Sequence, residues 1–181
     1  MAILKVDTIS GIGTEGPVFE GDIEFTSQNF LTLPKGDTTQ RGRGRALIAG
    51  GSTPSVTTNI DFLNIQSSGK SIDFGDLTHG RYDMSGCSNG IRGVFAGGRD
   101  SGGNEIDDTI DFVTIATTAN ATDFGDLSLA KNGVAALASA TRGVFAGGYT
   151  PTDQSTIEFL NFQSSGGVND FGDLLFPKSF Y

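Results

Sequence analysis

Short stretches in which apolar and polar residues alternate recur along this chain. In TIDFVTIA (109–116), Ile110 and Phe112 share one face of an extended chain, while Asp111 and Val113 share the other. Apolar runs such as GVFA, closed by a glycine pair, are typical of buried strands. No segment longer than two turns has the period of a helix. The pattern therefore predicts an all-β protein built from short antiparallel strands.

The strand-like stretches form an internal repeat. Each unit has an apolar strand closed by two glycines, then an alternating stretch, then the sequence DFGDL. Arg45, Arg92 and Arg142 begin the three copies, so the period is 47 and then 50 residues, and the three extra residues fall in the polar loop 99–108. The segment 133–148 predicts two strands joined by a tight turn. A unit of this size predicts a four-stranded antiparallel sheet.

Residues that recur in every unit are interpreted as structural. One active site requires one set of unequal groups, whereas a residue copied into each unit is better explained as a turn or contact residue. These residues are Gly50, Gly51, Gly97, Gly98, Gly147, Gly148, Asp76, Asp126 and Asp173. We expect the aspartates to accept backbone N–H bonds, with a weak Ca²⁺ site as the alternative. We expect Arg92 and Arg142 to make either a repeated surface contact or a contact between units.

Composition narrows the chemistry further. The 181 residues carry a formal charge of −9, which disfavours a nucleic-acid partner. One cysteine, Cys87, and one histidine, His79, exclude an intrachain disulfide and the usual Cys/His zinc site. We expect Cys87 to be a small buried residue and His79 a surface residue. No signal peptide or membrane-spanning run is visible, and we predict no cofactor and no metal.

The repeat carries a resemblance to a known family. A glycine pair that closes an apolar strand, with an aromatic residue about a dozen residues later, resembles a Kelch-type repeat. The chain departs from that pattern because it has no Trp and its two Phe positions stand 12 residues apart, as at Phe62 and Phe74. The resemblance implies propeller blades over 40–181 (about 40–90, 91–140 and 141–181), and Kelch partners are not carried over.

Residues 1–39 lie outside the repeat; their pattern predicts short β-strands cut by Gly and Pro, and they carry a second resemblance. LKVDTIS (4–10) and FLTLPKGDTTQR (30–41) resemble the openings of bacteriophage virion appendage proteins, in particular tail fibres of marine phages and cyanophages. The resemblance implies that 1–39 attaches the chain to the particle or joins its copies. It also implies a virion protein that is made in the host cytoplasm.

These observations predict a structural protein and not an enzyme. The expected role is a tail-fibre or other appendage subunit whose rigid β domain binds the host surface. One alternative is a capsid decoration or head-fibre protein without a receptor role. Another is a glycan depolymerase, which would need two carboxylates across a cleft; the non-repeated acids are Glu105, Asp107, Asp108 and Asp153.

Two sets of residues are candidate contact sites. The receptor candidates, for a host-surface glycan, lie in loops that differ between units: Arg99, Asp100, Asn104, Glu105, Tyr149 and Asp153. Arg41 and Arg43 are candidate assembly contacts with other virion proteins. Three blades leave two open edges, which two chains in a six-bladed ring, a trimer around a fibre axis, or the N-terminal strands could cover. We expect a homo-oligomer, and the resemblance to tail fibres implies a trimer in preference to a dimer.

Overall fold

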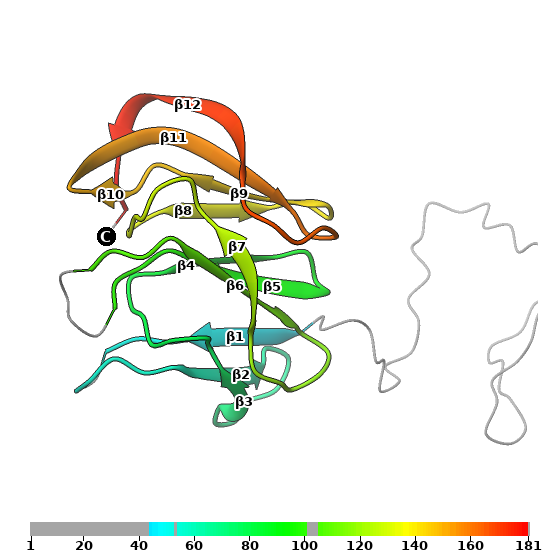
Figure 1. Ribbon diagram of the computed structural model, residues 1–181. Helices are drawn as coiled ribbons and strands as arrows, with labels where there is room; N and C mark the ends of the chain where they lie inside the picture. Colours follow the sequence, from blue (N-terminus) through cyan, green and yellow to red (C-terminus); the bar gives the residue numbers. More distant parts are fainter. Residues whose placement is uncertain (1–43, 53, 101–104, 181) are drawn as a thin grey trace, which may run out of the picture. The chain divides into compact units, whose positions relative to one another are not determined.

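The computed structural model describes residues 44–52, 54–100 and 105–180, and these residues form an all-β structure (Figure 1). Within these described residues, twelve strands make three antiparallel sheets. The predicted fold class is therefore confirmed at the level of antiparallel β-sheet. None of the described residues belongs to a helix, so none forms a helix that could cross a membrane. The predicted segment 1–39 lies outside the described residues.

Each sheet is a run of neighbouring antiparallel strands. Sheet 1 has the order β1 (Arg45–Ala49), β2 (Asn59–Asn64), β3 (Ile72–Asp76). Sheet 2 has the order β4 (Ser85–Ser88), β5 (Arg92–Ala96), β6 (Thr109–Thr114), β7 (Thr122–Asp126). Sheet 3 contains β8 (Ala135–Ala138), β9 (Arg142–Ala146), β10 (Tyr149–Thr150), β11 (Thr152–Asn161) and β12 (Asn169–Lys178).

The sheets do not coincide with the sequence repeats. Strand β4 lies before the second repeat begins but pairs with β5, and β8 likewise pairs with β9 of the following unit. The hairpin predicted within 133–148 is thus confirmed as β8–β9. Within the part of the chain that the structure describes, sheet 1 has no strand equivalent to β4 and β8. The edge of β1 is consequently unpaired there.

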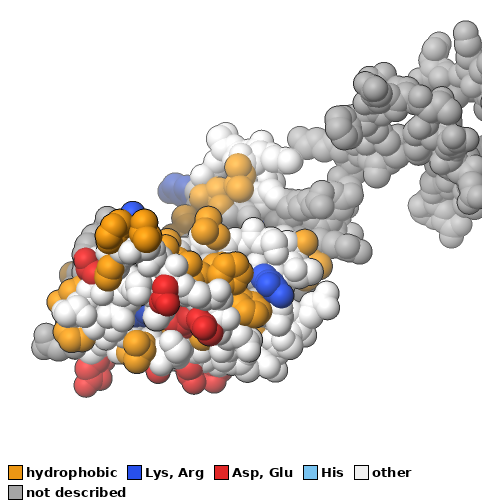
Figure 2. Space-filling model, turned by 90° about the horizontal axis from the view of Figure 1, so that it is seen from above, with side chains coloured by type: hydrophobic (Ala, Val, Ile, Leu, Met, Phe, Trp, Pro, Cys, Tyr) orange, Lys and Arg blue, Asp and Glu red, His pale blue; other side chains and the backbone are white. Residues whose placement is uncertain are grey.

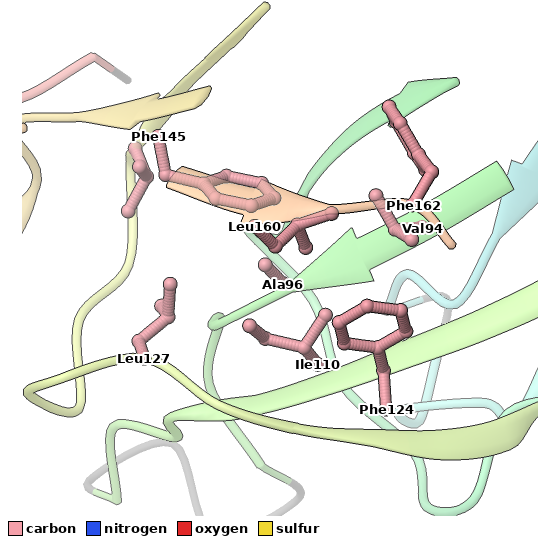
Figure 3. Close-up of a cluster of buried hydrophobic side chains, with 9 residues drawn as sticks. Val94, Ala96, Ile110, Phe124, Leu127, Phe145, Leu160 and Phe162 are labelled. Carbon is pink, nitrogen blue, oxygen red and sulfur yellow. The ribbon is translucent and has the colours of Figure 1, made fainter. Parts of the chain in front are cut away.

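The three sheets stack face to face, with sheet 2 in the middle (Figure 1). One buried cluster fills the space between sheets 1 and 2 and includes Ile60, Phe74 and Val113. A second fills the space between sheets 2 and 3, where Ile110 and Phe124 meet residues such as Leu160 (Figure 3). Neighbouring β6 residues therefore point into different clusters, as the alternation predicts.

The phenylalanines 12 residues apart are explained by the sheet. Each pair lies on adjacent strands and makes an edge-to-face contact, with ring centroids 6.1 Å apart for Phe62 and Phe74 and 5.8 Å apart for Phe112 and Phe124. The arginine that begins each unit lies over the first ring, 4.7 Å away at Arg45. The same arrangement recurs in sheet 3.

Candidate functional site

The repeated glycine pairs have a structural role. Gly50, Gly97 and Gly147 each have a positive φ, and a Cβ at any of them would collide with a backbone carbonyl oxygen, that of Arg81 in the case of Gly50. The second glycine of each pair donates its N–H to the same series of carbonyls, as Gly51 does to Arg81 at 2.9 Å. The glycine pairs therefore let the backbone at Arg81, Lys131 and Lys178 pack closely against them and accept their N–H bonds.

The repeated aspartates bind hydroxyl groups. Asp76 accepts from the Oγ1 of Thr58 at 2.7 Å, and Asp173 accepts from the Oγ of Ser155 at 3.2 Å. The expected backbone N–H bond belongs instead to an earlier aspartate of the motif, since Asp123 Oδ1 accepts from Gly125 N at 2.8 Å. No group of three or more His, Cys, Asp or Glu within 44–52, 54–100 and 105–180 could hold a metal ion.

The second copy of this aspartate differs from the other two. Asp108 stands where Thr58 and Ser155 stand, so Asp126 faces a carboxylate and not a hydroxyl. Local desolvation first, and then the negative charge of Asp108 and neighbouring aspartates, raise the pKa of Asp126 above its ordinary value. This surface pair is a locally unfavourable feature of sheet 2.

A buried ion pair connects the loop after β3 to sheet 2. Arg81, in the loop after β3, places Nη2 2.6 Å from Oδ2 of Asp111 on β6, and both side chains are fully buried. The hydroxyl of Thr78 donates to the other oxygen of Asp111 at 2.7 Å. Because a buried charge is costly unless it is paired, the two groups hold the loop against sheet 2.

The same arrangement joins sheets 2 and 3. Lys131, in the loop after β7, binds the buried Glu158 of β11 through Nζ, and the Ser128 hydroxyl donates to Glu158 at 2.9 Å. Neither ion pair was predicted from the sequence. A signal for them was present: an acidic residue recurs between the first two apolar positions of each alternating stretch, and a basic residue recurs four positions after each DFGDL leucine.

His79 belongs to this network and is therefore not an isolated surface residue. Its Nε2 lies 2.6 Å from Oδ2 of Asp107. Burial acts to raise the pKa of Asp107, but hydrogen bonds from Thr109 and His79 and the charge of Arg81 outweigh it and hold the pKa below its ordinary value. Asp107, one of the acids considered for catalysis, thus serves as an ionised link within the stack.

The candidate receptor residues Arg99 and Tyr149 meet at one buried side chain. When the Asn132 amide is oriented to satisfy its neighbours, its oxygen accepts from Nε of Arg99 and its nitrogen donates to the Tyr149 carbonyl, both at 3.1 Å. Tyr149 and Asn132 also pair through their backbones. The structure therefore brings these two residues together across the boundary between sheets 2 and 3.

The other receptor candidates are more dispersed. The Asp100 N–H donates to the Glu105 carbonyl at 3.1 Å, which closes the β5–β6 loop, and the Glu105 side chain is exposed. Asp153 lies in the β10–β11 hairpin and accepts from the Ser179 hydroxyl at 2.7 Å. Asn104 lies outside the described residues, as do the assembly candidates Arg41 and Arg43.

An open cavity of about 420 Å³ lies along the unpaired edge of β1, between β1 and strands β4 and β5. Its lining includes Arg45, Met84 and Cys87 but no carboxylate or histidine, so it offers no acid–base pair. Burial raises the pKa of the Cys87 thiol to about 12, which makes a nucleophilic thiolate scarce at neutral pH. No family model matches this chain, and no curated protein is similar to it.

Proposed function

We propose that the chain is a structural, non-enzymatic subunit of a bacteriophage particle, a tail-fibre or other appendage protein that attaches through residues 1–39. The resemblance of 4–10 and 30–41 to virion appendage proteins supports the phage role. The strand order β4-β5-β6-β7 supports the proposal that the sheets are Kelch-like propeller blades.

One observation carries the structural role. The ionisable groups that the fold buries are used to join one sheet to the next, as Arg81 joins Asp111 and Lys131 joins Glu158. A catalytic carboxylate pair needs two acids in one cleft with different environments. Of the acids considered, Asp107 is held in the inter-sheet network and Asp108 faces the repeated Asp126. The buried charged residues therefore hold neighbouring sheets together.

The edge that carries Arg99 and Tyr149 is the proposed contact with a host-surface glycan. These positions differ between repeats, whereas the residues that join the sheets recur. An aromatic ring can stack on a sugar, and a carboxylate such as Asp153 can accept from its hydroxyls.

The location of the protein in the particle tests the main proposal. Gold-labelled antibody against the full chain, applied to purified particles of the phage that encodes it, is expected to mark tail appendages. Label spread over the capsid would support the decoration alternative and contradict the appendage role. Particles that contain none of the protein would contradict any virion role.

A binding measurement tests the glycan contact separately. The full chain is expected to bind polysaccharide from the host surface, and the double change Tyr149→Ala and Asp153→Ala should weaken that binding at least about tenfold. The control Ser164→Ala changes an exposed residue in the turn between β11 and β12, at the other end of the strands. Shortened polysaccharide chains after incubation would instead support a depolymerase.

A further inference from the structure

The two outer faces of the stack carry the same groups that join its sheets inside. For the face of sheet 1 turned away from sheet 2, we use the name lower outer face; it contains Ile48, Asp61 and Ile65. The face of sheet 3 turned away from sheet 2 is the upper outer face; it contains Arg142, Phe171, Gly172 and Lys178. Each of these residues has two counterparts in the repeat, so its expected partner can be identified from the contacts of those counterparts.

The first complementary pair is ionic. Asp61 occupies the repeat position of Asp111 and Glu158, which bind Arg81 and Lys131 of the preceding unit. Asp61 belongs to the first unit, and among the described residues no basic side chain pairs with it. Lys178 occupies the position of Arg81 and Lys131, and it has no carboxylate partner within the described part of the chain. Asp61 thus lacks a basic partner and Lys178 lacks an acidic one, so each residue could serve as the partner of the other.

The second pair is a hydrogen bond from an arginine. Arg45 donates to the Ile115 carbonyl of the next sheet at 2.9 Å, and Arg92 donates to the Phe162 carbonyl at 2.6 Å. The third copy, Arg142, lies 4.5 Å above the Phe159 ring and donates to no described residue. The carbonyl at the equivalent repeat position is that of Ile65, on the lower outer face.

Apolar residues on the two outer faces are exposed, whereas their counterparts between the sheets are buried. Ile65 is 66% exposed, whereas its counterpart Ile115, which faces sheet 1, is 4% exposed. On the upper outer face Phe171 is 56% exposed, whereas its counterpart Phe124 is 2% exposed. Figure 2, which views the stack from the side of sheet 3, shows apolar side chains spread over this face among charged ones. Side chains that form the core inside the stack are therefore left in solvent at both ends.

A repeated glycine lies where the backbone of one sheet comes close to the backbone of the next. A Cβ at Gly75 or Gly125 would collide with the backbone of the next sheet, at Ala119 and at Gly167 respectively. Gly172 is the third member of this series and has the same φ of +135° as Gly125, yet no described atom lies within 4 Å of a Cβ placed there. This φ alone favours glycine at position 172. What the described contacts lack is the close backbone neighbour that Gly75 and Gly125 have, and a sheet docked on the upper outer face would supply it.

We propose that a second copy of this chain docks its lower outer face on the upper outer face of the first, and that the two chains close a ring of six sheets. In this ring Lys178 of one copy pairs with Asp61 of the other, and Arg142 donates to the Ile65 carbonyl. Two chains give six sheets, within the roughly four to eight that such rings contain, whereas three chains would give about nine. The faces therefore favour two chains over the trimer expected from the fibre resemblance.

The upper outer face lacks one hydroxyl of the repeat, and a serine of sheet 1 takes its place. Leu175 stands where Thr78 and Ser128 donate their hydroxyls to the buried carboxylate, and Leu175 is 89% exposed. In sheet 1 the hydroxyl comes from the same chain, because Ser71 Oγ donates to Asp61 Oδ2 at 3.0 Å. The counterparts of Ser71 are Ala121 and Val168, which have no hydroxyl.

The native mass of the full chain tests the stoichiometry. Sedimentation at micromolar concentration is expected to give the mass of two chains, and this outcome does not depend on the phage role. A mass of one chain would overturn the proposal and leave residues 1–43 or a different protein as the occupant of these faces. A mass of three chains would overturn the ring of six sheets.

Charge exchange tests the geometry. Lys178→Glu and Asp61→Lys, each alone, should raise the dissociation constant at least about thirtyfold, because each places like charges together in both interfaces. The two changes in one chain should restore association, since Glu and Lys then face each other again. The control Glu105→Lys makes the same charge change as Asp61→Lys, but on an exposed loop, and should leave the mass unchanged. Single variants that remain fully paired, or a double variant that stays apart, would overturn the assignment.

A glycine pair gives an independent check. Gly172→Ala should weaken association, because the added methyl group meets the docking sheet. Gly90→Ala, also at a positive φ with no described atom within 4 Å of the added Cβ, lies in the β4–β5 turn and should leave the mass unchanged. Equal association of Gly172→Ala and the unchanged chain would contradict a close backbone approach at this position.

Discussion

Arg81 and Asp111 are 30 residues apart in sequence, yet their fully buried side chains approach to 2.6 Å between Nη2 and Oδ2. Arg81 follows sheet 1 and Asp111 lies in the middle of sheet 2. The guanidinium also donates to the Thr109 carbonyl at 2.7 Å, so it binds β6 through both side chain and backbone. Sheet 2 and the loop after sheet 1 are consequently coupled by one charged contact.

Removal of one partner of this ion pair should strongly lower the free energy of unfolding. Asp111→Ala is expected to lower the free energy of unfolding by about 3–5 kcal/mol. It removes the buried carboxylate closest to the Arg81 guanidinium, which then keeps only Asp107 at 3.5 Å. Replacement of both residues by apolar ones, Arg81→Met with Asp111→Leu, should recover part of the loss. Chemical denaturation checks both, with Glu105→Gln on the exposed loop as the control. A loss below about 1 kcal/mol for Asp111→Ala would contradict a tightly buried pair.

The facing carboxylates Asp108 and Asp126 predict a pH-dependent cost. The folded-state pKa of Asp126 is raised, so the folded protein holds its proton more tightly than the unfolded chain does. The cost is therefore fully present above the folded-state pKa and absent below the ordinary aspartate pKa of 3.8. Asp108→Thr should raise the free energy of unfolding at pH 7 by about 0.5 kcal/mol, a small amount because water screens the pair.

Thr58→Ala is the matched comparison for that change. Thr58 is the sheet 1 counterpart of Asp108, and its hydroxyl donates to Asp76. Thr58→Ala removes from sheet 1 the kind of hydroxyl that Asp108→Thr would add to sheet 2. It should lower the free energy of unfolding by up to about 1 kcal/mol. If the gain from Asp108→Thr were the same at pH 3 as at pH 7, repulsion between the carboxylates would not be its cause.

The strands and the repeat could be predicted from the sequence because they depend on local pattern. The alternation at Ile110 and Asp111 gave the correct faces, and the turn after Ala138 gave the correct hairpin. The assignment of β4 and β8 to the following sheet could not be obtained in this way. A strand between two units carries no local mark of which neighbour it pairs with.

The ion pairs required a different kind of inference. Asp111 alternates with apolar residues like any solvent-facing strand residue, and its burial depends on the sheet that covers it. The receptor candidates show the same limit, since Arg99 and Tyr149 are 50 residues apart and both contact Asn132. Only comparison of equivalent acidic and basic positions across all three units could have indicated the inter-sheet pairs from sequence.

The thiol of Cys87 should react slowly. With a pKa of about 12, its thiolate fraction at pH 8 is smaller than that of an ordinary cysteine by roughly three orders of magnitude. Titration with an aromatic disulfide at pH 8 should therefore proceed at least about a hundredfold more slowly in the folded chain than in urea. Equal rates in the two states would show that the thiol is not desolvated.

The glycine pairs allow backbone strain to be separated from steric collision. Gly51 and Gly97 both have positive φ, +107° and +65°, but only Gly97 lies where a Cβ would meet a carbonyl oxygen, that of Lys131; no described atom is within 4 Å of a Cβ on Gly51. Gly51→Ala should therefore cost about 1–2 kcal/mol of unfolding free energy from the left-handed conformation alone. Gly97→Ala should cost about 1–3 kcal/mol more, because the loop carrying Lys131 must move and its ion pair with Glu158 moves with it. Denaturation of the two variants under the same conditions measures the difference. Equal losses would mean that the glycine pair serves only the turn and does not seat the loop that joins one sheet to the next.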